Sequence, residues 1–507
     1  MISKFKTKYS SMPVQVRASL WFLICNFMQK GIAFISTPIF TRILTTEQYG
    51  EFNVFQSWMS IVSIIVTLRL CYGVFMQGLV KFEHDAKVYA SSMQGLTLTL
   101  CTVWTVIYFL FRGFFNELLN LSTIQMCFML ALIWTTETFQ FWSAEQRVNN
   151  KYRLLVAVTL IVLFAQPALG VVLVILSEPQ NKATARILAL LIVNIAAYTW
   201  CFFIQMKRGR KFFSKRYWSY ALKFNLPLIP HYLSQSVLYG CDRIMISRYI
   251  SDDATGIYSL AYSVAVIMTM FNTTLSQVMA PWIYRKIKDR KVGDLAHVVY
   301  TAILIVAAAN LVLIMLAPEA IAIFAPPKYA DAKWVVPPVA LSVFFMYMYD
   351  TFAAFQFYFE KSWFIMGASV MGAVLNIVLN YFCLNDRWLG LGYEAAGYTT
   401  LICYMIYALG HYICMRWVCR KHLDGVRVYD PRVLVGVSAC FVSAGLLLTL
   451  TYDVPVLRFS FVGALLLIMI IFRKKIIEYG KKLIAIRKAN KNENADASIA
   501  EEIAVED

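Results

Sequence analysis

Three ionisable residues, Lys30, Glu137 and Asp350, lie inside long runs of apolar residues, and Lys30 is roughly a dozen residues from either end of its run. A charge at the centre of a membrane-spanning helix costs several kcal/mol unless it faces water, a partner or a ligand. Lys30 cannot easily reach either surface, because a lysine side chain extends only about one helical turn along its helix. The three residues are therefore candidates for contact with a ligand or an ion.

The two carboxylates suit a different chemistry from the lysine. A buried carboxylate can take up and release a proton, and its oxygens are suitable ligands for Na⁺. Glu137 and Asp350 could instead hydrogen-bond to Thr, Tyr or Lys on neighbouring helices, and Tyr347 and Tyr349 are nearby donors. An ion pair of Lys30 with either carboxylate would also hold helices together. The sequence leaves these alternatives open.

Arg69 and His231 are weaker candidates for an anionic ligand, and with Lys30 they would form a cationic cavity. Arg69 lies a few residues from the end of its apolar run, where a snorkelling side chain also explains it. His231 follows Pro227 and Pro230, which remove backbone donors and should kink or unwind the helix. Such a break is a candidate hinge. The alternative is an irregular helix with a hydrogen-bonded histidine.

Four more polar residues fall inside apolar runs. Asp242 and Arg243 lie near the end of one run and are interpreted as a gate or a structural pair. Asn376 and Asn380 are four residues apart, so they share one helix face and are expected to join helices. Aromatic residues make up 15% of the chain, but membrane proteins use them in interfaces and belts, and we assign them no site.

The composition indicates which solvent surrounds these residues. The chain has 507 residues, of which 60% are hydrophobic and 15% charged, and its mean hydropathy is +0.61. A water-soluble core could not hide that much apolar surface, so hydrocarbon must be the main solvent. The net charge of +18 comes from short Lys and Arg clusters between apolar runs, which argues against nucleic-acid binding. The eleven cysteines form no CxxC pair, so neither disulfides nor a zinc site is indicated.

Runs of roughly 20 apolar residues are long enough to cross about 30 Å of hydrocarbon as helices. The sequence predicts about fourteen such helices, and therefore an all-α polytopic membrane protein. The predicted spans are residues 18–41, 51–72, 89–111, 121–143, 154–177, 183–206, 219–247, 254–282, 295–317, 334–358, 362–384, 394–416, 431–452 and 455–472. The first run is too long for a signal peptide and lacks a cleavage site, so we expect a retained helix.

Lysine and arginine are concentrated in alternate connections between these spans. One set of connections, which includes KRGRKFFSKR from Lys207, holds roughly 35 of the 47 Lys and Arg residues. Because positively charged loops stay in the cytoplasm, both termini are predicted to be cytoplasmic.

Two internal matches predict a duplication. The segment TRILTTEQYGEFNVFQS aligns without gaps on SRYISDDATGIYSLAYS, which pairs Gly50 with Gly256, and ETF at Glu137 matches DTF at Asp350. Six predicted helices separate the members of each pair, so we expect two six-helix lobes related by a pseudo-twofold axis along the membrane normal. The predicted parts are a lobe at 1–206, a basic cytoplasmic linker at 207–216, a lobe at 217–430, an appended helix pair at 431–472 and a disordered cytoplasmic tail at 473–507.

Several motifs resemble one transporter family. The run from Pro38 through TRILTTEQYGEF resembles the helix 1 to helix 2 signature of the polysaccharide and O-antigen flippases, in the multidrug/oligosaccharidyl-lipid/polysaccharide exporter superfamily. LKFNLPLIPHYLSQSVLYGCDRIMISRYI, followed by ATGIYSLAYS, is similar to the family's Pro-x-x-Pro helix 7, its Asp-Arg near the outer end and the Gly-x-Tyr that opens helix 8. Asn376 and Asn380, followed by GLGYEAAGYTT, are similar to its helix 11 to helix 12 passage. The resemblance covers most of residues 10–420.

The resemblance implies a function as well as a fold. Two lobes around a central cavity would move a polyprenyl-diphosphate-linked oligosaccharide from the cytoplasmic to the outer leaflet of a bacterial inner membrane, for O-antigen, capsule or exopolysaccharide. Lys30 would attract the diphosphate, and the lipid tail would stay in the bilayer beside the appended pair. The implied partners are the lipid-linked oligosaccharide, membrane lipid, and polysaccharide polymerase and glycosyltransferase machinery.

The sequence also favours a transporter over an enzyme. No nucleophile with a base at diagnostic spacing, Walker loop or Gly-rich nucleotide motif is visible, so we expect a secondary transporter and not an enzyme. It would need no cofactor, and its coupling ion would be H⁺ or Na⁺. The alternatives are an ion-coupled multidrug exporter, a flippase for the lipid-linked peptidoglycan precursor and a membrane glycan polymerase. A polymerase would be expected to carry a large outer loop, whereas the longest one here, APEAIAIFAPPKYADAKW, is short.

Overall fold

The structure is a computed structural model that describes residues 14–471, except for a few side chains within that range, Lys30 among them. Every regular element in the described range is a helix, either α or short 3-10. The all-α prediction is therefore confirmed.

A long helix lies in each predicted span, although the span 219–247 begins with a short helix and a 3-10 turn, and short helices join the long ones. The long helices are α2 (Val14–Ile43), α3 (Thr46–Thr67), α5 (Ala86–Leu110), α7 (Thr123–Val148), α8 (Tyr152–Leu176), α9 (Lys182–Gly209), α11 (Ile229–Tyr249), α12 (Asp252–Lys288), α13 (Leu295–Met315), α15 (Ala332–Tyr358), α16 (Ser362–Leu384), α17 (Ala395–His422), α18 (Pro431–Thr449) and α19 (Pro455–Ile471). The short helices are α4 (Val74–Lys81), α6 (Arg112–Leu119), α10 (Lys215–Asn225) and α14 (Ala317–Phe324), with 3-10 turns at η1 (Glu83–Asp85), η2 (Pro179–Asn181), η3 (Leu226–Leu228), η4 (Val292–Asp294) and η5 (Pro327–Tyr329).

Fewer of the described helices qualify as membrane crossings than the sequence predicts. By length and apolar composition, ten of the described helices can cross a membrane, or up to eleven if α6 and α7, which are bent by 88°, count as one span. The predicted number of fourteen is thus not confirmed. The spans outside the ten are α3, α7, α11 and α19, because α19 has only 17 residues and the others carry more polar side chains.

Large apolar side chains lie on the outside of these helices. Leu110, Leu176, Leu450 and Trp363 are 72%, 77%, 77% and 80% exposed. Exposed apolar side chains in such number are unfavourable in water, whereas hydrocarbon accommodates them and satisfied helical backbones can enter it. The surface is that of a multi-pass membrane protein.

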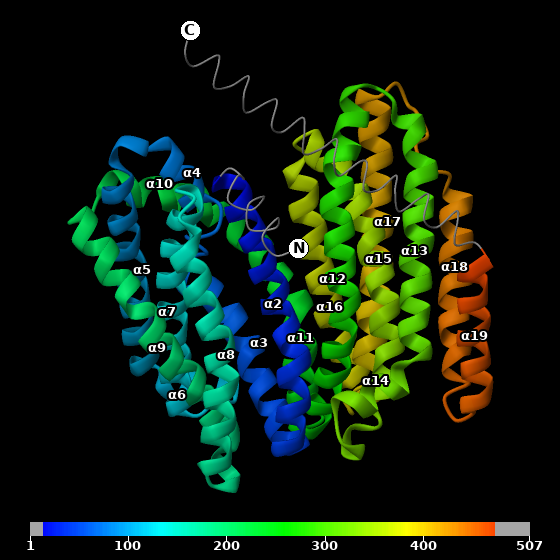
Figure 1. Cartoon of the computed structure of the whole chain (residues 1–507), viewed down its shortest axis with the longest axis horizontal. Coiled ribbons are helices and arrows are strands. Elements are labelled where there is room, and N and C mark those ends of the chain that lie inside the picture. Colours follow the sequence, from blue (N-terminus) through cyan, green and yellow to red (C-terminus); the bar gives the residue numbers. More distant parts are fainter. Residues whose placement is uncertain (1–13, 472–507) are drawn as a thin grey trace, which may run out of the picture. The chain divides into compact units, whose positions relative to one another are not determined.

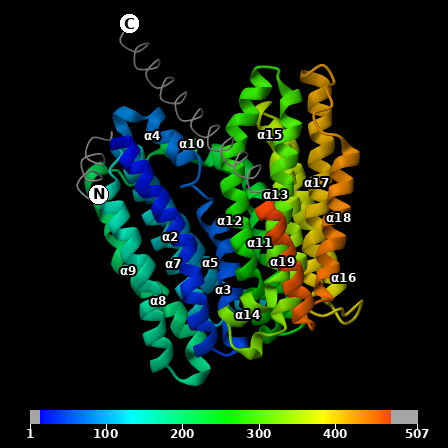
Figure 2. The same ribbon diagram turned by 45° about the vertical axis from the view of Figure 1, so that its right-hand side comes forward.

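The chain divides into two compact units, each described here by itself. Unit 1 contains residues 1–259 and 324–328, and unit 2 contains residues 260–323 and 329–507. In unit 1, α9 packs on α5, α7 and α8, while α2 packs on α8 and α3 packs on α11 (Figure 1, Figure 2). In unit 2, α15 packs on α13, α17 and α18, and α16 packs on α17. The division falls inside α12, and the predicted parts of the chain, which rest on the internal repeat, stay a prediction.

Two capping boxes fix the starts of the helices that carry Gly50 and Glu137. The Thr45 hydroxyl accepts a hydrogen bond from the Gln48 backbone N–H, and the Gln48 side chain accepts one from the Thr45 N–H. Ser122 caps α7 in the same way through Gln125 three residues later. Reciprocal bonds of this kind satisfy backbone donors that no intrahelical carbonyl can reach.

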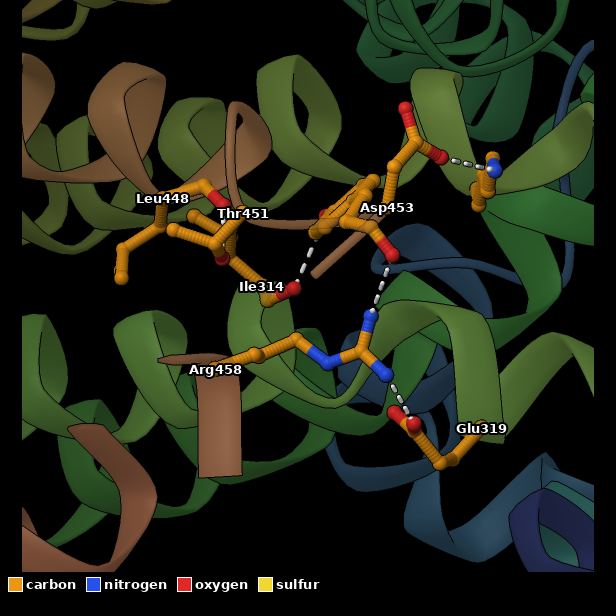
Figure 3. A network of polar contacts seen from close by, with 8 residues as sticks. Ile314, Glu319, Leu448, Thr451, Asp453 and Arg458 are labelled. Atoms are coloured by element: carbon orange, nitrogen blue, oxygen red, sulfur yellow. Dashed lines mark hydrogen bonds and ion pairs between the residues drawn. The ribbon is translucent and has the colours of Figure 1, made fainter. Parts of the chain in front are cut away.

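The turn between α18 and α19 is held inside unit 2 by a polar cluster (Figure 3). Arg458 of α19 is 3% exposed, pairs with Glu319 of α14 and donates to the Tyr452 carbonyl at 3.1 Å. The Tyr452 hydroxyl donates to the Ile314 carbonyl at 2.8 Å. The carboxylate balances the charge of the buried guanidinium, and the carbonyl accepts from one more of its donors. The cluster fastens the C-terminal helix pair to α13 and α14.

We expect Arg458→Ala to loosen this turn. Losing hydrogen bonds from a charged donor costs about 1.5–3 kcal/mol, and Glu319 would be left without its cation. Limited proteolysis of the purified protein should therefore cut the turn faster than in wild type. Lys333→Met is the matched control, because it removes the 3.6 Å pair with Asp453, whose side chain is 80% exposed, and the contact of the ammonium with the Trp334 ring. Equal cleavage of the two variants would mean that Arg458 does not hold the turn.

Candidate functional site

Lys30 lies in the middle of α2, and its side chain is outside the described residues, so its role stays a prediction. The preceding residue, Gln29, lines a cavity of about 70 Å³ that also contacts Gln140 and Arg147. A polar cavity of this size can hold water. The middle of α2 therefore borders a space that polar groups can share with solvent.

Glu137 lies inside unit 1 and is 6% exposed. The Thr67 hydroxyl and the Cys71 thiol lie beside its carboxylate, and the charge of Arg69 attracts it. Arg69 thus lies next to a buried carboxylate, and its guanidinium also packs on the Tyr72 ring at 5.4 Å.

A strained turn after α3 brings Arg69 close to Glu137. Leu68 and Arg69 both have φ of 52°, a left-handed conformation that is uncommon for residues with a side chain. The Asn225 amide donates to the carbonyls of both residues at 2.8 Å, which holds the turn from the end of α10. The sequence does not predict positive φ at a leucine followed by an arginine.

Pro227 and Pro230 lie where predicted helix 7 is interrupted. The segment runs as α10, then the 3-10 turn η3 with Pro227, and then α11, which has Pro230 in its first turn. His231 follows, half-buried, and its ring is 5.9 Å from that of Tyr232. The structure has the irregular backbone that a hinge needs. Bending at this position stays a prediction.

Asp242 and Arg243 contact different parts of unit 1. Asp242 is 1% exposed and accepts a hydrogen bond from the Tyr258 hydroxyl of α12 at 2.7 Å. Arg243 is 7% exposed, donates to the Tyr239 carbonyl at 2.9 Å and lies 5.6 Å from the Tyr239 ring. Asp242 therefore ties the end of α11 to the start of α12.

The starts of α3 and α12 touch backbone to backbone, within unit 1. A Cβ atom added to Gly50 would lie 1.8 Å from the Asp252 carbonyl oxygen, and one added to Gly256 would lie 2.0 Å from the Thr46 carbonyl oxygen. The Thr46 hydroxyl also hydrogen-bonds to Asp253. Only glycine permits so close an approach. The two glycines that the internal repeat pairs are thus in direct contact.

Asp350 lies at a cavity of about 370 Å³ between α12 and α15 in unit 2. The Ser276 hydroxyl donates to Asp350 at 3.2 Å, and Tyr349 also hydrogen-bonds to this carboxylate. Hydroxyl and amide groups of Thr273 and Gln277 line the same cavity. Carboxylate, hydroxyl and amide oxygens are the donors that a hard cation prefers, and the space can hold water beside it. Of the two carboxylates, Asp350 has the surroundings that better suit a proton or Na⁺.

Asn376 and Asn380 join α16 to α17 inside unit 2. Both are fully buried, and the Asn380 amide donates to Asn376 at 3.4 Å. Thr399 of α17 donates to Asn380, and Asn376 donates to Thr400 at 3.5 Å. These contacts agree with the interpretation that the pair connects helices.

Two arginines that the sequence prediction left out have defined surroundings. Arg458 holds the α18–α19 turn, and Arg186 of α9 packs on the rings of Phe40 and Phe52. Each lies a few residues inside a predicted span, so the rule applied to Lys30, that ionisable residues in apolar runs need a reason, would have found both.

Comparison with known proteins agrees on one group of transporters. A family profile described as polysaccharide biosynthesis protein matches residues 16–286, and a profile described as MatE matches residues 227–382. Among curated proteins, Lsg locus putative protein 1 of Haemophilus influenzae is 22% identical over 377 residues, which cover 71% of this chain and 88% of that protein.

Solved structures with the same fold share little sequence. A structure of the lipid II flippase MurJ in an inward closed conformation has a TM-score of 0.68 at 13% identity and covers 90% of this chain and 100% of its own. An inward-facing multidrug resistance transporter of the MATE family has a TM-score of 0.56 at 13% identity, over 78% of this chain and 96% of its own. At such identities the likeness concerns the fold.

Proposed function

Because the chain belongs to the polysaccharide biosynthesis protein family of the multidrug/oligosaccharidyl-lipid/polysaccharide exporter superfamily, we propose that it moves a polyprenyl-diphosphate-linked oligosaccharide from the cytoplasmic to the outer leaflet of a bacterial inner membrane. The observation that carries the proposal is the match of residues 16–286 to that family. The glycan would serve a surface polymer such as O-antigen, capsule or exopolysaccharide.

The mechanism we propose is alternating access. Lys30 attracts the diphosphate, because an ammonium in a hydrated cavity offers three donors to phosphoryl oxygens. The glycan crosses through water, and the lipid tail stays in the bilayer beside α18 and α19. Arg69 extends the cationic surface along the path, His231 adds a polar wall to it, and the break at Pro227 and Pro230 supplies the hinge.

Coupling to an ion gradient is proposed for the buried carboxylates. Asp350 takes up H⁺ or Na⁺ from its cavity, and Glu137 is the corresponding residue of the other half. No step in this cycle forms or breaks a covalent bond, so the protein acts as a transporter and not as an enzyme. Glycosyltransferases would build the substrate before it is moved, and a polysaccharide polymerase would use it afterwards.

A second candidate substrate is the lipid-linked peptidoglycan precursor. The observation that favours it is the likeness of the fold to a lipid II flippase over 90% of this chain. Both substrates carry a polyprenyl diphosphate, so the proposed role of Lys30 would be the same. The match of residues 227–382 to MatE is compatible with multidrug export. That function would need an acidic cavity in place of a cationic one.

Flipping in proteoliposomes tests the proposal. Wild type should move a labelled polyprenyl-diphosphate oligosaccharide faster than lipid II and faster than liposomes without protein. Lys30→Ala should slow this movement about tenfold, because a charge-assisted hydrogen bond of about 1.5 kcal/mol or more is lost, while Lys30→Arg should retain most of it. If wild type moves lipid II alone, the second substrate replaces the first, and if it moves neither under any gradient, the assignment falls.

A further inference from the structure

Tyr72 is an exposed aromatic residue on a well-fixed turn between α3 and α4. It is 61% exposed. Its backbone N–H donates to the Arg69 carbonyl at 2.9 Å, and its own carbonyl accepts from the Val74 N–H at 3.0 Å. Asn225 holds the same turn through the carbonyls of Leu68 and Arg69. An aromatic ring on a fixed backbone can bind a ligand with little loss of conformational entropy.

A second tyrosine ring lies close to Tyr72 at nearly a right angle. The centre of the Tyr232 ring, from the first turn of α11, is 6.1 Å from that of the Tyr72 ring, and the two planes differ by 83°. The Arg69 guanidinium is 5.4 Å from the centre of the Tyr72 ring. The His231 ring is 5.9 Å from that of Tyr232. Arg69, Tyr72, His231 and Tyr232 therefore form one group within unit 1, the Tyr72 cluster.

The polar groups of the Tyr72 cluster have hydrogen-bonding capacity that the described part of the chain does not use. None of the four side chains makes a hydrogen bond to another described residue, and Arg69 Nε and His231 Nδ1 are buried without a partner. Unpartnered buried nitrogens are uncommon in native proteins. The Glu137 carboxylate attracts Arg69, so the guanidinium has a counter-charge nearby while its N–H donors stay unused. A neutral ligand with hydroxyls therefore suits these donors.

The combination of exposed rings and unused donors does not suit a surface covered by lipid tails. Hydrocarbon leaves N–H and O–H groups without partners, which costs free energy. A tyrosine in an interfacial aromatic belt can direct its hydroxyl to water, but such a belt does not account for an arginine and a histidine with unused donors around it. A ligand with an apolar face and several hydroxyls would satisfy both the rings and the donors.

We propose that the Tyr72 cluster binds a sugar ring of the transported glycan. The faces of a pyranose ring carry C–H groups with a partial positive charge, and the negative face of an aromatic ring attracts them. Hydroxyls at the edge of the sugar accept from Arg69 and exchange hydrogen bonds with His231 and the two tyrosine hydroxyls. This identification rests on the proposed function, which supplies the glycan. It adds recognition of the sugar to the proposed contact of Lys30 with the diphosphate.

Binding of two lipids that differ only in the sugar tests the site. Calorimetry on the purified full-length protein, in a neutral detergent, compares the polyprenyl-diphosphate oligosaccharide with polyprenyl diphosphate alone. Tyr72→Ala should weaken the affinity for the first lipid about threefold to tenfold, because a ring contact is lost, and should not change the affinity for the second. Tyr72→Phe should keep most of the affinity, since it retains the ring. An equal loss for both lipids would overturn the sugar site.

Two further variants separate binding from structure. Tyr232→Ala removes the second ring and should also weaken binding of the oligosaccharide lipid alone. If Tyr232→Ala fails to fold, Tyr72→Ala keeps the test valid, because an exposed side chain contributes little packing. Tyr398→Ala is the matched control: it removes a tyrosine that is 41% exposed on α17, in unit 2, and should bind both lipids as wild type does. Wild-type affinity for the oligosaccharide lipid in both Tyr72→Ala and Tyr232→Ala would overturn the site.

Saturation-transfer NMR with the free oligosaccharide separates the site from the proposed function, because it requires no flipping. Wild type should transfer saturation to the C–H protons of the sugar, and Tyr72→Ala should lose most of this signal. If the signal behaves in this way but wild type flips no lipid-linked oligosaccharide, the site stands and the proposed function falls. If wild type flips the lipid and the signal is absent, or equal in the two proteins, the function stands and the site falls.

Discussion

Gly50→Val should lower transport about tenfold to a hundredfold. A Cβ at this position would lie 1.8 Å from the Asp252 carbonyl oxygen, so the starts of α3 and α12 must separate. Overpacking of this kind costs roughly 1–3 kcal/mol, which is enough to shift a two-state equilibrium by that factor. If the transport cycle includes a state in which the starts of α3 and α12 touch, a protein that cannot form this contact stays in the state in which they are apart.

The shift can be measured directly by electron–electron double resonance. Spin labels at Glu47→Cys and Ser251→Cys, in a background in which the eleven native cysteines are replaced, would report the separation of the two helix starts. Gly50→Val should deplete the short-distance population seen with the native glycine. Gly436→Val is the control, because a Cβ there meets nothing within 4 Å. An unchanged distance distribution in Gly50→Val would show that the contact is not part of the cycle.

Asp350→Asn should abolish the part of transport that an ion gradient drives, lowering it about a hundredfold and leaving exchange down the substrate gradient. Asparagine has nearly the shape of aspartate, but it carries no charge and cannot bind or release a proton in this pH range. The cavity beside Asp350 would stay open, and the ion that occupies it would lose its counter-charge. Removing a charged partner from an ion site costs several kcal/mol.

Flipping under separately imposed pH and Na⁺ gradients is the measurement, and it also identifies the ion. Ser276→Ala should give a smaller loss, of about tenfold or less, because it removes one neutral donor. Asp294→Asn is the matched control, since the Asp294 side chain is 61% exposed, hydrogen-bonds to Lys286 and does not line the Asp350 cavity. Full gradient-driven transport by Asp350→Asn would assign the carboxylate a structural role.

Local sequence rules predicted the helices and several of their irregularities. Apolar runs located all the long helices because spanning hydrocarbon leaves no other backbone geometry. Pro227 and Pro230 predicted the break before α11, and the spacing of Asn376 and Asn380 predicted contacts along one helix face. The number of membrane crossings was harder to predict. Helices α3 and α11 carry polar side chains in place of apolar ones, and these lower the mean hydropathy by which a span is recognised.

Contacts between distant segments could not be read from the sequence. The repeat paired Gly50 with Gly256 as equivalent positions, yet nothing in it required them to touch. Arg69 was assigned to a snorkelling position or a cavity, and its place beside Glu137, after the positive φ of Leu68, could not be foreseen from the sequence. Such placements depend on how helices far apart in the chain pack, which periodicity does not encode.

Helix α12 has a mechanical consequence. It runs unbroken from Asp252 to Lys288, and twenty residues, or about 30 Å, separate Gly256 at its start from Ser276 beside Asp350. If such a helix tilts as a rigid body by about 5° about one end, its other end moves by about 2.6 Å over this length. Ion binding and helix contact at the two ends would then influence each other equally, so Gly50→Val should also change the ion affinity at Asp350.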